Sequence, residues 1–176
     1  MVCGIALIVG VVGGWVLSRS SDDSAANLTN PTIGTNANND GNDFDFVELE
    51  ALDGSGDVVL DGSDRNFVVN FWFSTCGPCK REMPALAAAA VKYAGHVDFV
   101  GINPNDNAET AVAFLDSYGV EYANYLDDGD QLEAAGVTTM PTTFFVKDGR
   151  IAETHAGELT AEEIDEVVTR VFGAAS

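Results

Sequence analysis

The segment from residue 66 to residue 93 constrains the fold most strongly, because it joins a buried strand to a helix through two cysteines. Residues 66–73 read Asn-Phe-Val-Val-Asn-Phe-Trp-Phe, a short run that is rich in strand-forming residues and apolar on both faces. Residues 79–93 are rich in alanine, a composition that lets a helix lie close to a sheet, with Pro84 inside the run. We therefore expect a central strand, covered by helices on both faces, that leads directly into a helix.

Further strands and helices are predicted on either side of this unit. Apolar residues at helical spacing predict one helix around residues 111–118 and another around 164–171, with a capping box of Thr160 and Glu163 before the second. A weak strand and a short helix are expected before residue 142. The remaining strands are predicted at residues 44–50, 58–60, 97–102, 142–146 and 150–154. This order predicts an α/β fold with a central mixed β-sheet flanked by helices on both faces.

The N-terminal region differs in composition from the rest of the 176-residue chain. Residues 2–17 carry no charge, whereas the next two dozen are almost purely Ser, Asp, Asn, Thr and Gly. We expect residues 1–17 to be a membrane anchor or signal segment, residues 18–43 a flexible polar linker, and residues 44–176 one domain. The apolar run is short for a spanning helix and lacks a basic flank on its N-terminal side. We predict that this segment is an uncleaved membrane anchor. The alternatives are a cleaved signal peptide and a cytosolic protein whose N-terminus is apolar by chance.

Acidic residues dominate the charge of the chain. There are 28 Asp and Glu residues against 8 Lys and Arg residues, which gives a net charge of −20. Nucleic-acid binding needs a basic footprint, so this class of function is excluded. The acidity indicates a solvated surface, which would also suit a high-salt habitat, and it says little about the fold.

Cys76-Gly77-Pro78-Cys79 stands at the end of the buried strand and at the start of the helix, a placement typical of a redox site. Unpaired N–H groups at a helix N-terminus favour a thiolate, so we expect Cys76 to be the more exposed and more acidic cysteine. It would attack a substrate disulfide, and Cys79 would then resolve the mixed disulfide. Pro78 suits the first helical turn, where its missing N–H costs nothing.

A structural disulfide and half of a zinc site are the alternative interpretations of this cysteine pair. Zinc needs further ligands. The chain offers only Cys3, inside the apolar segment, together with His96 and His155, which lie far apart in sequence. We therefore predict redox chemistry with no metal and no cofactor.

Residues 69–84, Val-Asn-Phe-Trp-Phe-Ser-Thr-Cys-Gly-Pro-Cys-Lys-Arg-Glu-Met-Pro, resemble the active-site segment of the TlpA/ResA-like thioredoxin family. The similarity continues through residues 100–103, 117–120 and 140–144 and covers roughly residues 44–172. Members of this family are membrane-tethered thiol–disulfide oxidoreductases. The resemblance implies a thioredoxin-like fold with an N-terminal strand extension and a ββ/α-type insert.

The resemblance also implies roles for single residues. Pro141 would be a cis-proline that faces the Cys76–Cys79 disulfide, an ordinary trans turn being the alternative. The Met140 backbone would then lie beside Cys76, where a substrate peptide can pair as an added strand. Trp72 is expected to frame the motif by packing.

Polar residues in and around the motif bear on how the cysteines would be tuned. Asn70 stands where cytosolic thioredoxins carry a buried Asp, and an amide cannot take up a proton. In ResA-like proteins an acidic residue after the third core strand lies near the cysteines. Asp106 holds that position here, with Glu109 as a substitute; either Asp106 is a solvated loop acid, or it lies beside Cys79 and raises the pKa of that thiol. Glu82 is expected to form a local salt bridge or cap, with no catalytic role.

We therefore predict an extracytoplasmic thiol–disulfide oxidoreductase that reduces protein disulfides. The resemblance implies apocytochrome c as a client and a membrane electron donor of the CcdA/DsbD type. Gly77-Pro78 matches reducing thioredoxins, with potentials near about −270 mV, rather than strong oxidants near about −120 mV.

Three other functions are alternatives to this one. One is a disulfide-forming oxidant. Another is a peroxiredoxin-type peroxidase, which needs Thr where Phe73 stands. The third is a non-enzymatic copper carrier, which needs more widely spaced cysteines and a well-placed His.

Overall fold

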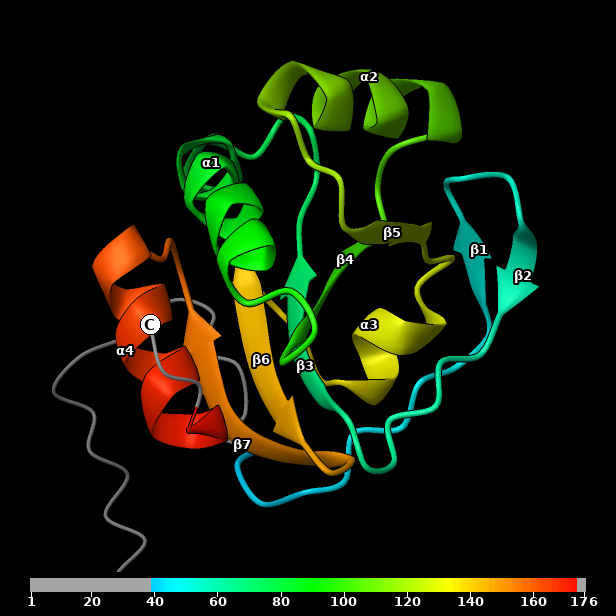
Figure 1. The fold of residues 1–176 in the computed structure, drawn as a ribbon. Helices are drawn as coiled ribbons and strands as arrows, with labels where there is room; N and C mark the ends of the chain where they lie inside the picture. The colour runs from blue at the N-terminus through cyan, green and yellow to red at the C-terminus, as the bar shows by residue number, and fades with distance from the viewer. Residues whose placement is uncertain (1–38, 174–176) are drawn as a thin grey trace, which may run out of the picture. The chain divides into compact units, whose positions relative to one another are not determined.

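Strands and helices alternate along residues 39–173, the part of the chain that the computed structural model describes (Figure 1). Their order agrees with the order that the sequence predicted. The elements are β1 (Leu49–Ala51), β2 (Gly56–Val58), β3 (Asn66–Phe71), α1 (Gly77–Lys92), β4 (Asp98–Asn103), α2 (Ala108–Tyr118), β5 (Ala123–Leu126), α3 (Asp130–Ala134), β6 (Thr142–Lys147), β7 (Arg150–Ala156) and α4 (Ala161–Phe172). The insert between α2 and β6 thus contains β5 and α3.

The seven strands form one mixed sheet in the order β2-β1-β5-β4-β3-β6-β7. β3 pairs in parallel with β4, from Phe67 opposite Asp98 to Phe71 opposite Ile102. On its other side β3 pairs antiparallel with β6. Because β3 is hydrogen-bonded along both edges, its carboxyl end is held firmly, and the segment that follows it begins from a fixed point.

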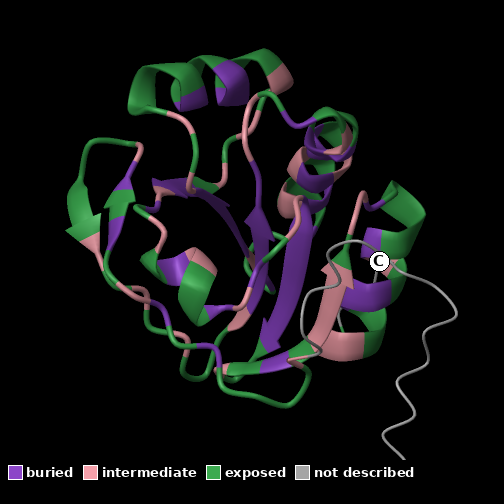
Figure 2. Cartoon of the chain, turned by 180° about the vertical axis from the view of Figure 1, so that it is seen from behind, coloured by how far each residue is buried: buried purple, intermediate pink, exposed green. Residues whose placement is uncertain are grey.

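The two faces of β3 contribute to different parts of the core. Phe67, Val69 and Phe71 face the side covered by α3 and the segment before β1. Val68 faces the opposite side, where α1 and α4 pack. Figure 2 shows the central strands as buried, with exposed residues on the outer faces of the helices, in the loops and on the β1–β2 hairpin. The predicted arrangement of a mixed sheet between helices is confirmed, and so is the capping box at the start of α4.

Both strands of the N-terminal hairpin have boundaries that differ from the prediction. β1 covers Leu49–Ala51 and not residues 44–50, because the backbone N–H groups before it bond to other partners: Phe44 donates to the Gly149 carbonyl and Val47 to the Gln131 side chain. β2 starts two residues earlier than predicted, at Gly56, since Asp53 accepts a hydrogen bond from the Ser55 N–H and closes a tight turn.

The folded domain also begins earlier than the predicted linker boundary at residue 43. The Gly41 N–H donates to the Ile151 carbonyl at 2.7 Å, and the Asn39 amide donates to the Ala135 carbonyl at 2.9 Å. Asp43 forms an ion pair with Arg150. Residues 39–43 therefore belong to the domain, because these polar side chains and backbone groups find partners on β7 and after α3.

No helix within residues 39–173 is long and apolar enough to cross a membrane. The predicted anchor at residues 1–17, and the predicted linker up to residue 38, lie outside the described residues.

Candidate active site

The cysteine pair lies at the start of α1, a few residues after the end of β3. After Phe71 the backbone makes one more bond to β4, from the Trp72 N–H to the Ile102 carbonyl at 3.0 Å, and then leaves the sheet. Cys76 is the N-cap residue of α1, and Pro78 occupies the first turn, as predicted. The two cysteines therefore lie at the N-terminal end of a 16-residue helix, directly after the central strand.

Cys76 and Cys79 form a disulfide, with their Cα atoms 5.3 Å apart. Cys76 keeps 5% of its surface exposed, whereas Cys79 is fully buried. The backbone N–H of Cys79 points at the Cys76 sulfur, with a nitrogen–sulfur distance of 3.2 Å. This N–H and the positive end of the helix dipole favour a negative charge on Cys76 once the disulfide is opened.

The Met140–Pro141 peptide bond is cis, as the resemblance implied, and Pro141 is buried. Met140 packs against the cluster of buried residues that includes both cysteines and Trp72. On the outer side of Met140 lies a pocket of about 240 Å³. It is lined by Phe73, Leu132, Val137, Thr138, Thr139 and Met140.

Trp72 is held by two neighbours that the sequence did not reveal. Its indole N–H donates to the Asn124 side-chain oxygen at 3.0 Å, and its ring stacks on Phe114 with centroids 4.9 Å apart. Gly101 makes this arrangement possible, since a Cβ atom there would lie 1.8 Å from the Asn124 oxygen. Trp72 thus packs beside the motif, as predicted, and the hydrogen bond that it donates to Asn124 on β5 fixes its orientation.

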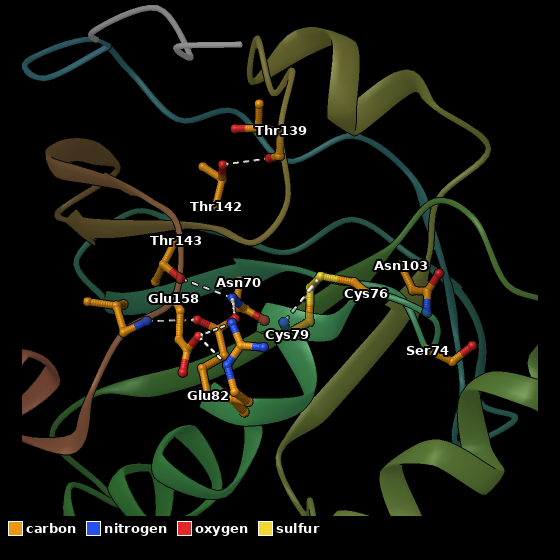
Figure 3. The surroundings of a disulfide bond; sticks show 12 residues. Asn70, Ser74, Cys76, Cys79, Glu82, Asn103, Thr139, Thr142, Thr143 and Glu158 are labelled. Atoms are coloured by element: carbon orange, nitrogen blue, oxygen red, sulfur yellow. Dashed lines mark hydrogen bonds and ion pairs between the residues drawn. A yellow bond between two sulfur atoms is a disulfide. The ribbon is translucent and has the colours of Figure 1, made fainter. Parts of the chain in front are cut away.

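Asp106 lies against the loop that precedes the cysteines. Its carboxylate accepts hydrogen bonds from the Ser74 N–H at 2.6 Å, the Ser74 hydroxyl at 2.8 Å and the Asn103 amide at 2.8 Å. It is therefore not a solvated loop acid, and it joins β4 to the active-site loop, whereas Glu109 is exposed. Figure 3 shows Ser74 and Asn103 on the Cys76 side of the disulfide, away from Asn70 and Glu82.

Glu82 was expected to form a local salt bridge or cap, and this expectation is wrong. Glu82 is fully buried, and none of the ion pairs within residues 39–173 includes it. Its carboxyl accepts hydrogen bonds from the Asn70 amide at 2.9 Å and from the Leu159 N–H at 3.1 Å. The sequence offered one signal, since Glu82 follows Cys79 by three residues and so shares its side of α1.

The surroundings of Glu82 change its acidity. Burial raises the pKa of Glu82 from 4.5 to about 7; the hydrogen bonds from Asn70 and Leu159 oppose this rise, and the nearby Glu158 charge adds to it. A carboxyl that titrates near neutral pH can both accept and donate a proton under physiological conditions. Glu82 lies one helical turn after Cys79 on α1.

Residues 39–173 contain no group of three or more His, Cys, Asp or Glu side chains arranged to hold a metal ion.

Comparisons with known proteins agree with this geometry. The sequence model of the Redoxin family matches residues 31–170. The thiol–disulfide oxidoreductase ResA of Halalkalibacterium halodurans is 30% identical over 121 residues, which cover 67% of this chain and 69% of that protein. ResA of Bacillus subtilis is 28% identical over 135 residues, or 75% of each chain.

Solved structures show the same fold. A putative thiol:disulfide interchange protein DsbE from Chlorobium tepidum superposes with a TM-score of 0.69 at 25% identity, covering 76% of this chain and 98% of that one. A secreted disulfide oxidoreductase of Mycobacterium tuberculosis superposes with a TM-score of 0.65 at 22% identity, covering 71% and 96%.

A thioredoxin-like sheet with a Cys-x-x-Cys disulfide at a helix N-terminus defines a thiol–disulfide oxidoreductase. This chain belongs to the Redoxin family, and its relatives of the ResA type have the same activity in their names.

Proposed function

We propose that this protein reduces disulfide bonds in polypeptides outside the cytoplasm. The observation that carries the proposal is the Cys76–Cys79 disulfide, with Cys76 as the helix N-cap and 5% exposed and Cys79 fully buried. This asymmetry assigns different tasks to the two sulfurs. Attack on a client requires access and a stabilised thiolate, both of which favour Cys76 in the reduced protein, whereas resolution requires only a neighbouring thiol.

The reaction proceeds in two exchanges. In the reduced protein the Cys76 thiolate attacks one sulfur of a client disulfide, and the other client sulfur leaves as a thiolate. Cys79 then loses its proton and attacks the Cys76 sulfur, which releases the client dithiol and forms the Cys76–Cys79 disulfide. The client gains two electrons and the protein loses two, so an external dithiol donor must restore the reduced state.

Glu82 is the group that we assign to the Cys79 proton. It lies one helical turn from Cys79, it is buried, and its pKa is raised to about 7 by that burial. Asp106 is assigned a different role: its three hydrogen bonds position the Ser74 backbone, two residues before Cys76, and it takes no part in proton transfer.

A client peptide would dock beside Pro141 and Met140. The pocket of about 240 Å³ has mostly apolar walls, and two of its lining residues, Phe73 and Met140, also pack against the cluster that contains the cysteines, so it suits a hydrophobic client side chain close to the client disulfide. The backbone of residue 140 would pair with the client as an added strand.

Apocytochrome c and a membrane donor of the CcdA/DsbD type are the client and reductant that the ResA resemblance favours. The test is to capture clients with Cys79→Ser, a variant that stops at the mixed disulfide, in cells that express the full chain. Cys76→Ser serves as the matched control because it cannot form that bond. Recovery of proteins with a Cys-x-x-Cys-His haem-binding motif would support cytochrome maturation; other clients would replace that assignment.

The direction of exchange is tested by equilibrium with glutathione. A potential near about −270 mV supports reduction, whereas a potential above about −150 mV would make the protein an oxidant. The location is tested by labelling intact cells with a membrane-impermeant thiol reagent after mild reduction. Protection of Cys76 in intact cells, together with labelling after lysis, would place the domain inside the cytoplasm and contradict the proposal.

A further inference from the structure

A buried hydrogen-bond acceptor next to the cysteines lacks a donor. Asn70 lies on β3, and its amide NH₂ donates to Glu82 at 2.9 Å and to the Thr143 hydroxyl at 3.0 Å. Both N–H groups are therefore used. Among the described residues no donor lies within reach of the Asn70 side-chain oxygen, although the residue is almost completely buried. An unsatisfied acceptor at such a position requires an explanation.

Turning the amide over does not remove the problem. While Glu82 is ionised its carboxylate only accepts hydrogen bonds, so the NH₂ group of Asn70 faces it, and the reversed amide would leave the NH₂ group unpaired in place of the oxygen. The amide oxygen then has to lie on the other side of the group. The unpaired oxygen is thus a consequence of the Glu82 contact.

Asn70 and Cys79 belong to two elements that pack against each other, β3 and the start of α1. Alternation along β3 places Asn70 on the face that packs against α1, where it meets Glu82. Cys79 precedes Glu82 by one turn on the same side of α1. Figure 3 shows Asn70 between Cys79 and Glu82. Asn70 and Cys79 are both buried, so neither the amide oxygen nor the sulfur can find a partner in solvent.

We propose that the Asn70 amide oxygen accepts a hydrogen bond from the Cys79 thiol in the reduced protein. The disulfide form lacks this bond because its Cys79 sulfur carries no proton. When a dithiol supplies two electrons and the S–S bond breaks, Cys76 leaves as a thiolate and Cys79 takes up one proton, which then lies between its sulfur and the Asn70 oxygen. This inference rests on the proposed dithiol chemistry and adds a redox-dependent contact to it.

Asn70 is a positioning residue in this scheme. Its amide cannot take the proton away, so the proton of Cys79 still passes to Glu82 during resolution. A hydrogen bond to the neutral thiol favours that form over the thiolate and keeps Cys79 protonated until a mixed disulfide forms. It also stabilises the reduced protein relative to the oxidised protein, in which the amide oxygen is unpaired.

Infrared spectroscopy tests the contact directly, because the S–H stretch is sensitive to hydrogen bonding. The measurement uses the reduced full chain with Cys3→Ser, after alkylation of Cys76, so that the remaining band belongs to Cys79. We expect this band at a lower frequency than that of a free thiol. A band at the free-thiol frequency would overturn the proposal without requiring any change at Asn70.

Two substitutions at Asn70 separate a direct role from one exerted through Glu82. Asn70→Leu and Asn70→Asp both remove the NH₂ donor to Glu82, but only Asn70→Asp keeps an oxygen toward Cys79. We expect Asn70→Leu to raise the S–H frequency and to disfavour the reduced form in equilibrium with dithiothreitol by about two- to tenfold. Asn70→Asp should keep the lowered frequency. Equal changes in both variants would show that Asn70 acts through Glu82 alone and would contradict the proposal.

Thr143→Val is the matched control, since it removes one partner of the amide and leaves the oxygen untouched. Its S–H band should match that of the parent chain. Failure of the proposed function gives a different result: the parent protein would then not reduce insulin disulfides with dithiothreitol. Insulin reduction combined with a free S–H band contradicts only the Asn70 contact.

Discussion

Two carboxylates flank the active-site segment, and they differ in almost every physical respect. Glu82 lies on the Cys79 side, fully buried, with two hydrogen bonds and a pKa raised to about 7 by burial. Asp106 lies against Ser74, is partly exposed, and accepts three hydrogen bonds. Burial without enough compensating hydrogen bonds favours the neutral acid at Glu82. The two carboxylates therefore differ in their surroundings: Glu82 occupies a buried site between β3 and α1, and Asp106 a partly exposed loop site.

The largest effect should appear in the pH dependence of stability after Glu82→Gln. Folding raises the pKa of Glu82 from 4.5 to about 7, so the native state holds its proton more tightly than the unfolded state. The resulting stabilisation is complete below about pH 4.5 and is lost as the pH rises through 7, a change of about 3 kcal/mol. Urea unfolding of the oxidised protein should show this loss in the parent chain and not in the variant. Parallel curves for the two proteins would contradict the raised pKa.

The same substitution should slow resolution of the mixed disulfide. Removing a general base lowers rates by roughly 10²-fold or more, and the titration near pH 7 should disappear from the pH–rate profile. Insulin reduction followed from about pH 5 to 9 measures both. Glu158→Gln is a suitable control, since it removes a nearby charge and leaves the Glu82 carboxyl in place. A retained titration near pH 7 in Glu82→Gln would assign the proton to another group.

Asp106→Asn should have a smaller effect of a different kind. The variant weakens the hydrogen bonds to Ser74, so we expect a loss of about 1–3 kcal/mol in the free energy of unfolding and a lower rate at every pH. The shape of the pH–rate profile should not change. Ser74→Ala provides the comparison, because it removes only the hydroxyl partner. A shifted profile in Asp106→Asn would give this carboxylate the proton-transfer role that we assign to Glu82.

Arg81→Ala should have the smallest effect. Arg81 forms an exposed ion pair with Glu158, and such pairs contribute about 1 kcal/mol or less. Its removal leaves the Glu158 charge unbalanced, which should raise the pKa of Glu82 further. The titration midpoint in the pH–rate profile reports this shift. A downward shift would contradict the arrangement of charges around Glu82.

The sequence by itself determined the features that depend on neighbouring residues. The buried run of residues 66–73, the cysteine spacing, the proline in the first turn of α1 and the Thr160–Glu163 capping box are local patterns, and the structure has all four. The predicted strand boundaries were wrong where a residue distant in sequence forms a hydrogen bond with the backbone. The Val47 N–H, for example, donates to the side chain of Gln131, 84 residues away.

Only the tertiary structure decided which polar side chains serve the site. Leu159 reaches Glu82 across 77 residues, Asp106 reaches Ser74 across 32, and Asn124 reaches Trp72 across 52. Each of these contacts depends on which strands and helices lie side by side. The local amino-acid composition does not predict which elements become neighbours. Burial sets the acidity of Glu82 for the same reason: the low-polarity surroundings that disfavour its charge are assembled from elements far apart in the chain.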